Sequence, residues 1–84
     1  MTHAEVEQKV RQALLSVAPE VETMPLQAAL PLRDQVDIDS MDFLRFVLEL
    51  HKQLGVDVPE ADYPELDSLE RMVDYIAARI GAQR

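Results

Sequence analysis

Cysteine is absent from this sequence, and histidine occurs only at His3 and His51. Without cysteine there is no disulfide framework, no thiolate zinc site and no cysteine nucleophile. Any thiol found on this protein must therefore have been added to it. Two histidines offer little to imidazole catalysis, and we expect no metal site. The core of a chain of 84 residues is barely large enough to fold, so we do not expect an enzyme.

Basic residues are also scarce. Lys and Arg together number 8, Asp and Glu number 16, and the formal net charge is -8. Nucleic acid is excluded as a partner because phosphate binding requires clustered Lys and Arg. An anionic membrane surface is disfavoured for the same reason, and a basic protein partner is favoured. No apolar run is long enough for membrane insertion, and residues 1–5 lack the features of a signal peptide, so we expect a cytoplasmic protein.

Helical periodicity predicts an all-α fold, a four-helix bundle with three long helices and one short one in a single domain, residues 1–84. The first helix begins at Thr2, which fits a capping box with Glu5, and it ends before Pro19. Residues 18–38 contain three prolines but are too apolar for a free linker. We expect them to form a long ordered loop held against the core.

The second predicted helix has the strongest pattern. Asp39 or Ser40 can cap its start, and Gly55 follows its end, where a left-handed residue is expected. Its apolar residues occupy more than one stripe, which predicts a central helix that contacts several neighbours. These residues are Met41, Phe43, Leu44, Val47, Leu48, Leu50 and Leu54.

Two further elements are expected after Gly55. Residues 60–66 can hold one short turn, broken near Pro64. The last helix starts at a second capping box or a close variant, in the sequence Asp67-Ser68-Leu69-Glu70, and we expect Gly81 to stop it.

The densest polar feature precedes the second helix, where Asp37, Asp39 and Asp42 surround Ser40. An ordinary helix cap explains this composition, because Ser and Asp satisfy free N–H groups. A calcium-binding EF-hand loop is excluded, since Asp42 occupies the place of the required glycine and Leu48 that of the bidentate glutamate. No histidine base or nucleophile motif accompanies the serine. Modification of Ser40 is therefore favoured over catalysis by it.

The stretch Asp39-Ser40-Met41-Asp42, the amphipathic helix that follows it and the Gly-x-x-x-Pro segment 55–59 together resemble an acyl carrier protein. In that family an Asp-Ser-Leu motif opens the second helix, and its serine carries a 4′-phosphopantetheine arm taken from coenzyme A. Residues 67–76 are similar to the family's fourth helix. The resemblance covers essentially the whole chain. It implies that Ser40 carries the arm and that acyl groups are held on it as thioesters.

The resemblance also implies roles for the neighbours of Ser40. Asp39 matches the motif acid, and Met41 stands in the place of the usual leucine. Together with Asp42, these two residues are expected to be recognised by the transferase that attaches the arm. The expected partners are a phosphopantetheinyl transferase and enzymes that load and process acyl groups, and the chain is expected to be a monomer. Asp37 stands where the family often has glycine, so the loop there is less free to adopt positive φ.

The partner-facing helix departs from the family pattern. That face is strongly acidic in housekeeping members, whereas this chain has Arg45, His51 and Lys52 there, and its acids crowd residues 55–67. If surface charge selects the partners, this difference indicates a specialised carrier in a dedicated pathway. The alternative is that these are solvent-exposed positions whose charges vary without consequence. Phe43 is expected in the core, whereas the ring of Phe46 is expected to be exposed. The partner-facing candidates are Arg45, Phe46, Glu49, Lys52, Asp57, Glu60 and Asp62.

Several functions stay open within this interpretation. The Asp before Ser40 is typical of fatty-acid or polyketide carriers, whereas peptidyl carriers often have Gly-Gly-His-Ser; a specialised lipid pathway is also compatible. A D-alanyl or aminoacyl carrier is a further alternative, since such proteins are also small and acidic. From another class, the chain could be an unmodified acidic helical module that binds a basic partner through residues 55–67.

Overall fold

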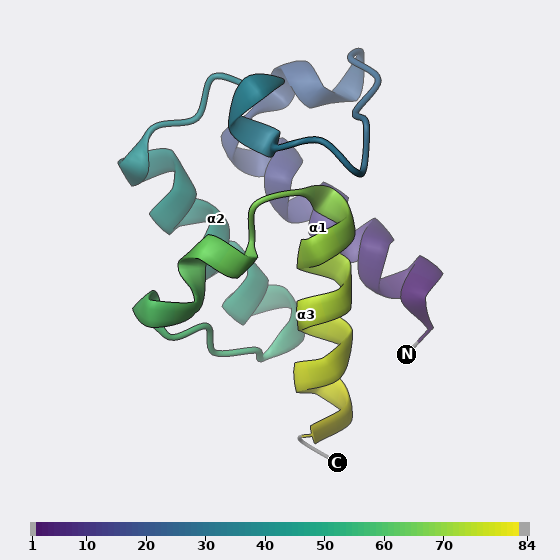
Figure 1. Cartoon of the computed structure of the whole chain (residues 1–84). Coiled ribbons are helices and arrows are strands. Elements are labelled where there is room, and N and C mark those ends of the chain that lie inside the picture. Colours follow the sequence, from purple (N-terminus) through teal and green to yellow (C-terminus); the bar gives the residue numbers. More distant parts are fainter. Residues whose placement is uncertain (1, 83–84) are drawn as a thin grey trace.

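The computed structural model describes residues 2–82, and its path is shown in Figure 1. Helices account for all the regular structure in this range, which confirms the predicted helical bundle with three long helices. Short 3-10 helices lie between them. In chain order the elements are α1 (His3–Val17), η1 (Pro19–Glu22), η2 (Leu32–Asp34), α2 (Ser40–Leu54), η3 (Glu60–Glu65) and α3 (Leu69–Ala82).

Helix α1 is the element that packs against both other long helices. Its start is the predicted capping box, in which the Thr2 hydroxyl accepts from the Glu5 N–H at 3.2 Å and the Glu5 carboxylate accepts from the Thr2 N–H at 3.0 Å. The Thr2 N–H and the Thr2 hydroxyl can both donate to Glu5 Oε1, and these two bonds to the carboxylate hold the pKa of Glu5 below its usual value. One face of α1 is fully buried and consists of Val6, Val10, Ala13 and Leu14.

The expectation that the second helix is central was therefore wrong, because α1 occupies that position. Of the two apolar stripes on α2, one is buried and carries Phe43, Val47 and Leu50. The other stripe is exposed to solvent. At its end α2 behaves as predicted: Gly55 has φ 67°, and its N–H donates to the His51 carbonyl at 2.8 Å.

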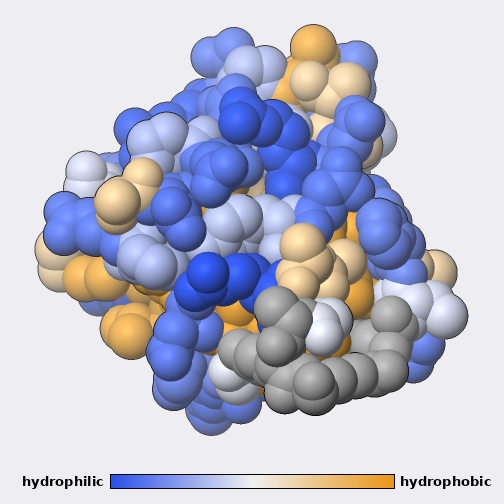
Figure 2. All heavy atoms as spheres, turned by 60° about the horizontal axis from the view of Figure 1, so that its bottom comes forward, coloured by the Kyte–Doolittle hydropathy of each residue, from blue (hydrophilic) through white to orange (hydrophobic). Residues whose placement is uncertain are grey.

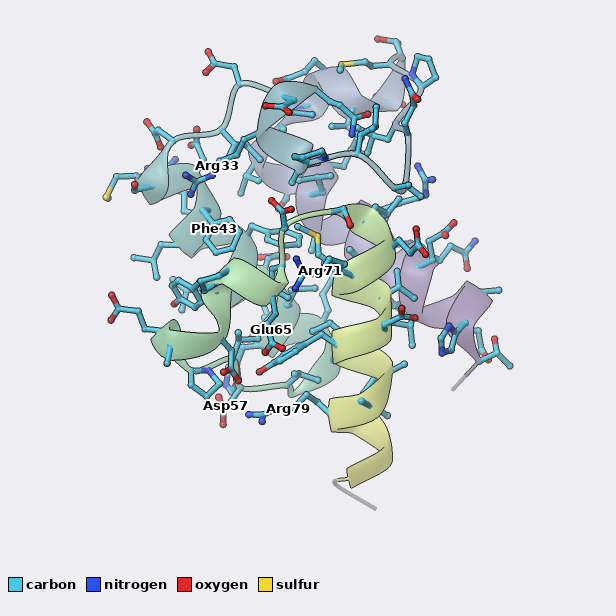
Figure 3. The ribbon with its side chains drawn as sticks, in the orientation of Figure 1. Arg33, Phe43, Asp57, Glu65, Arg71 and Arg79 are labelled. Atoms are coloured by element: carbon cyan, nitrogen blue, oxygen red, sulfur yellow. The ribbon has the colours of Figure 1, made fainter. Side chains whose placement is uncertain are left out.

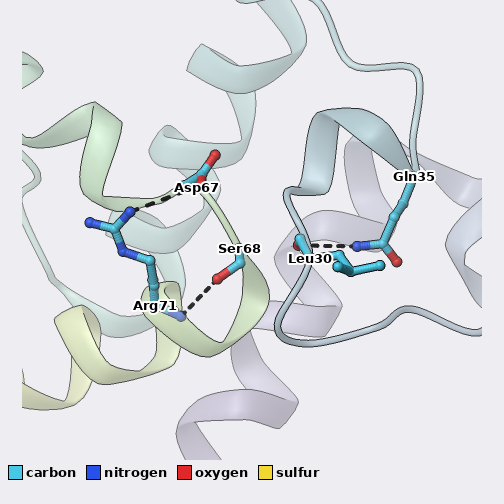
Figure 4. A network of polar contacts seen from close by, with 5 residues as sticks. All are labelled: Leu30, Gln35, Asp67, Ser68 and Arg71. Carbon is cyan, nitrogen blue, oxygen red and sulfur yellow. Dashed lines mark hydrogen bonds and ion pairs between the residues drawn. The ribbon is translucent and has the colours of Figure 1, made fainter.

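The segment between α1 and α2 is ordered, as expected, and η1 and η2 lie within it. The Gln35 side chain organises its middle. Gln35 Nε2 donates to the Leu30 carbonyl at 3.1 Å (Figure 4) and to the Gln27 carbonyl at 3.0 Å. The Leu32 N–H donates to the Asp67 carbonyl at 2.8 Å. This last bond, and the one from the Glu70 N–H to the Ala28 carbonyl at 3.0 Å, attach the segment to the start of α3.

Two expectations for the C-terminal part need correction. Pro64 does not break the turn but lies inside η3, because a 3-10 helix this short needs few N–H donors. Gly81 does not stop α3, which continues through it to Ala82. The start of α3 is a close variant of a capping box: Ser68 Oγ accepts from the Arg71 N–H at 3.3 Å, and residue Arg71 stands where glutamate would complete the box (Figure 4).

Hydrophilic residues cover most of the face shown in Figure 2, and hydrophobic residues gather in small groups. Within residues 2–82, no helix combines the length and apolar character needed to cross a membrane.

Candidate functional site

Ser40 is the first residue of α2, and its side chain is exposed. Asp39 is the N-cap: its Oδ1 accepts from the Asp42 N–H at 2.8 Å, and Asp42 Oδ2 accepts from the Asp39 N–H at 3.5 Å. The cap is thus Asp39, and the Ser40 hydroxyl makes no hydrogen bond with any residue in the range 2–82. The serine is free for another use.

The same capping box leaves two backbone donors at the start of α2. The first bond inside the helix runs from the Phe43 N–H to the Asp39 carbonyl at 2.9 Å, and Asp39 satisfies the Asp42 N–H. The N–H groups of Ser40 and Met41 have no partner among the described residues, as expected for the first turn of a helix. An anionic group on Ser40 would meet these donors and the positive end of the helix dipole.

The loop before Ser40 is held by alternating side chains. Val36 and Ile38 are buried, whereas Asp37 and Asp39 between and after them are exposed. Apart from Gly55, no residue in the described range has positive φ. Asp37 therefore needs no left-handed conformation, and the absence of glycine at this position strains nothing.

A cleft of about 340 Å³ opens beside the start of α2. Ile38 and Phe43, which flank Ser40 in the sequence, line one wall, and Tyr63 of η3 lines another. The Arg33 guanidinium lies over the Phe43 ring, 5.8 Å from its centroid (Figure 3). The remaining lining residues are Leu32, Pro64, Leu66 and Asp67. The cleft can hold part of an apolar group attached nearby, with a cation at its wall.

Phe46 does not have the exposed position that was expected from the sequence. Its ring is completely buried, so it cannot be a partner-facing residue. It packs against Phe43 with 6.1 Å between ring centroids, and Phe43 meets Tyr63 edge-on at 5.2 Å. The position of Phe46 on the buried stripe, one turn after Phe43, accounts for this. Phe43 lies in the core as expected, with 8% exposed.

The other partner-facing candidates are exposed or half-buried, on α2 and on the segment that follows it. Arg45 and Lys52 are exposed on α2, while Glu49 is half-buried and accepts from Gln53 Nε2 at 3.3 Å. The remaining three come after Gly55. Asp57 and Glu60 are exposed, whereas Asp62 is half-buried and accepts a hydrogen bond from Tyr75.

The acidic segment after α2 is tied to the helices at its start. Asp57 Oδ1 lies 2.9 Å from His51 Nδ1, and the Asp57 carbonyl accepts from Arg79 Nη2 at 2.8 Å. Figure 3 shows Asp57 and Arg79 facing one another between α2 and the end of α3. The segment therefore has a defined position beside α2.

An exposed apolar stripe on α2 was not predicted from the sequence. Met41, Leu44 and Leu48 are 62%, 42% and 59% exposed, and among described residues only Leu30 joins them as an exposed large hydrophobic side chain. Their spacing of three and four residues places them on one face of the helix. The signal was present in the sequence as the second apolar stripe, which was assigned to the interior.

Comparison with known proteins agrees with this geometry. The family model for the phosphopantetheine attachment site matches residues 8–76, a range that contains Ser40. An acyl carrier protein of Chlorobium phaeobacteroides is 24% identical over 79 residues, covering 94% of this chain and 100% of the relative. That of Chlorobium phaeovibrioides is 25% identical with the same coverage. That of Lactobacillus johnsonii is 26% identical over 76 residues, 90% of this chain and 94% of the relative.

The extent of these matches decides the family, because the model spans most of the chain and the relatives align over nearly all of it. The chain therefore belongs to the acyl carrier protein family, whose members are carriers and not enzymes and bear 4′-phosphopantetheine as a covalent cofactor.

Proposed function

We propose that Ser40 is the attachment point of 4′-phosphopantetheine and that the protein delivers acyl groups held there as thioesters. The observation that carries the proposal is the free, exposed hydroxyl of Ser40 at the first position of α2, within the residues that match the family model. When attached, the group supplies a thiol on a flexible arm. The chain, which has no cysteine, offers no competing thiol of its own.

The residues around Ser40 suit a phosphodiester at this position. The N–H groups of Ser40 and Met41 point out of the start of α2, where an anion is favoured. Asp39 and Asp42 bring negative charge close by, but each carboxylate is occupied by a backbone N–H in the capping box. Asp39, Met41 and Asp42 are also the residues that we propose the phosphopantetheinyl transferase contacts, since Met41 is 62% exposed beside the serine.

The cleft beside Ser40 is the part of the protein that would shelter the carried group. Its walls are the apolar side chains of Ile38, Phe43 and Leu66, so burial of an acyl chain there is favourable in proportion to the apolar area removed from water. Because the exposed cations Arg45 and Lys52 interrupt the acidity of α2, we favour a specialised pathway in fatty-acid, polyketide or lipid metabolism. Modification from coenzyme A suits a cytoplasmic protein.

Intact mass tests the attachment. The wild type, Ser40→Ala and Ser16→Ala are each incubated with coenzyme A and a broad-specificity phosphopantetheinyl transferase. Ser16 is a matched control, an exposed serine on α1. The expected result is a gain of one phosphopantetheine mass and one reactive thiol on the wild type and on Ser16→Ala, with none on Ser40→Ala. A gain on Ser40→Ala would move the attachment elsewhere.

The outcome also separates the alternative functions. No gain with that transferase and none on protein purified from its host would leave an unmodified interaction module that uses residues 55–67. If the gain occurs, loading of the modified protein distinguishes the remaining carriers. A thioester of an amino acid would indicate a D-alanyl or aminoacyl carrier, and a fatty or polyketide acyl thioester would indicate the favoured function.

A further inference from the structure

The cation at the wall of the cleft beside Ser40 has no anionic partner within the described part of the chain. Arg33 lies in η2, its side chain is exposed, and its guanidinium is 5.8 Å from the centroid of the Phe43 ring. It forms no ion pair with another residue in the range 2–82. Contact with the face of a ring attracts a guanidinium by its charge and leaves its N–H donors free. Arg33 can therefore donate to an anion.

The carboxylates that line the cleft or cap α2 have other partners. Asp67 lines the same cleft as Arg33, but its Oδ2 lies 3.9 Å from Arg71 Nη1 on α3 (Figure 4). Asp39 and Asp42 accept from backbone N–H groups in the capping box. The charge of Arg33 is thus available to a group that is added to the protein.

Arg33 lies close to the start of α2. Phe43 follows Ser40 by three residues, so these two positions lie on the same side of the helix, about one turn apart. Ile38, two residues before Ser40, lines the cleft together with Phe43 and Arg33. In Figure 3 the Arg33 side chain lies beside the first turn of α2, next to Phe43. The start of α2 therefore combines free backbone donors with a guanidinium at the edge of the cleft.

We propose that Arg33 binds the phosphodiester of the 4′-phosphopantetheine group and so directs the arm toward the cleft. This inference rests on the proposed attachment at Ser40. A guanidinium matches phosphate oxygens with two parallel N–H donors, which fixes a direction as well as a contact. Arg33 thus holds the start of the arm on the side of α2 where the cleft opens, away from the exposed side chain of Met41. It is a positioning residue for the carried group.

NMR spectroscopy of the full chain, before and after modification from coenzyme A, tests the phosphate contact. The Nε–H resonance of Arg33 is expected to shift on modification more than those of Arg45 and Arg71, because a charge-assisted bond forms at Arg33 alone. In modified Arg33→Gln, the phosphorus resonance is expected to move toward its position in the urea-unfolded modified protein. Arg33→Lys keeps the charge without the planar fork and is expected to give an intermediate position.

Arg45→Gln is the matched control. It changes the net charge by the same amount and lies on the same helix as Ser40, but Arg45 does not line the cleft. Five residues separate it from Ser40, which places it about 140° round the helix. We expect the phosphorus resonance of modified Arg45→Gln to match that of the wild type.

The two tyrosines report the direction of the arm. Tyr63 lines the cleft, whereas Tyr75 is not one of its lining residues. Modification is expected to shift the ring proton resonances of Tyr63 more than those of Tyr75. In Arg33→Gln the shift at Tyr63 is expected to fall by about half or more, because fewer molecules hold the arm on the cleft side.

Contrary results separate this proposal from the carrier function. If the wild type gains no phosphopantetheine mass, both proposals fail. If the mass gain occurs but the phosphorus resonance is the same in the wild type and in Arg33→Gln, attachment stands and the phosphate contact is wrong. Equal changes in Arg33→Gln and Arg45→Gln would show a general effect of charge and would also overturn it.

Two further outcomes are decisive. An unchanged Tyr63 shift in Arg33→Gln would show that Arg33 does not direct the arm. Circular dichroism checks that each variant is folded. The Nε–H comparison needs no variant, so an Arg33 resonance that does not respond to modification overturns the proposal even if Arg33→Gln fails to fold.

Discussion

The phenolic hydroxyl of Tyr75 donates a hydrogen bond to Asp62 Oδ2 at 2.6 Å, and this bond joins α3 to η3. One turn later on α3, Arg79 lies over the Tyr75 ring, 5.5 Å from its centroid, and donates to the carbonyl of Asp57. Helix α3 therefore holds residues 57–62 at both ends. The position of η3, and with it one wall of the cleft beside Ser40, depends on these contacts.

Stability at alkaline pH should depend on Tyr75. Burial and the hydrogen bond to Asp62 raise the pKa of Tyr75 from 10.0 to about 12. The folded state thus retains the proton that the unfolded state loses, so the contribution of Tyr75 is complete below pH 10 and is lost as the pH rises toward 12. Tyr75→Phe should remove this part of the pH dependence and lower the stability at neutral pH by about 1 kcal/mol.

Urea unfolding at a series of pH values from neutral to about pH 11.5 measures how the free energy of unfolding changes with pH. Tyr63→Phe is the matched control, since Tyr63 lies in η3 but its hydroxyl makes no hydrogen bond within the described residues. The control should keep the alkaline slope of the wild type. An unchanged slope in Tyr75→Phe would contradict the assignment.

The capping of α2 predicts unequal effects for two neighbouring substitutions. Asp39→Ala removes the acceptor for the Asp42 N–H and should lower the free energy of unfolding by about 1 kcal/mol. Ser40→Ala removes a hydroxyl without a partner in the described structure and should change stability by less than about 0.5 kcal/mol. Thermal and urea unfolding of the two variants measure these changes in stability. A larger loss in Ser40→Ala than in Asp39→Ala would show that the serine is the cap.

Substitution by alanine at Gly55 and at Gly81 should change the free energy of unfolding in opposite directions. Gly55 has φ 67°, and a methyl group there would meet no atom within 4 Å, so the effect of Gly55→Ala is one of backbone conformation alone. We expect a loss of about 1 to 2 kcal/mol. Gly81 lies within α3 in equally open space, so Gly81→Ala should be neutral or stabilise the protein by up to about 1 kcal/mol. Both are measured by urea unfolding, and effects of the same sign would contradict the prediction.

The two stripes of α2 should differ sharply in their effect on stability. Phe46 is completely buried, and Phe46→Ala should lower the free energy of unfolding by about 3 to 5 kcal/mol. Leu48 is 59% exposed, and Leu48→Ala should change it by less than about 0.5 kcal/mol. Circular dichroism during urea unfolding gives both values. A large loss in Leu48→Ala would mean that the second stripe is covered within the protein.

Much of the candidate site could be predicted from the sequence because it depends on neighbours along the chain. The serine between Asp39 and Met41 is the residue whose hydroxyl is free at the start of α2. The cleft beside Ser40 could not be predicted in this way. Its walls come from η2, α2 and η3. The bond from the Leu32 N–H to the Asp67 carbonyl holds η2 beside the end of η3, and the bond from Tyr75 to Asp62 holds η3 against α3.

The ends of α1 and α2 were determined by the sequence alone. A capping box joins residues three apart, as in Thr2 with Glu5 and Asp39 with Asp42, and Gly55 adopts positive φ at little cost wherever the helix lies. Only the tertiary structure decided which stripe of α2 is buried. Both stripes are apolar, and burial of Phe46 with exposure of Leu48 follows from the side on which α1 packs, since the helix covers one face of α2 and leaves the other to solvent.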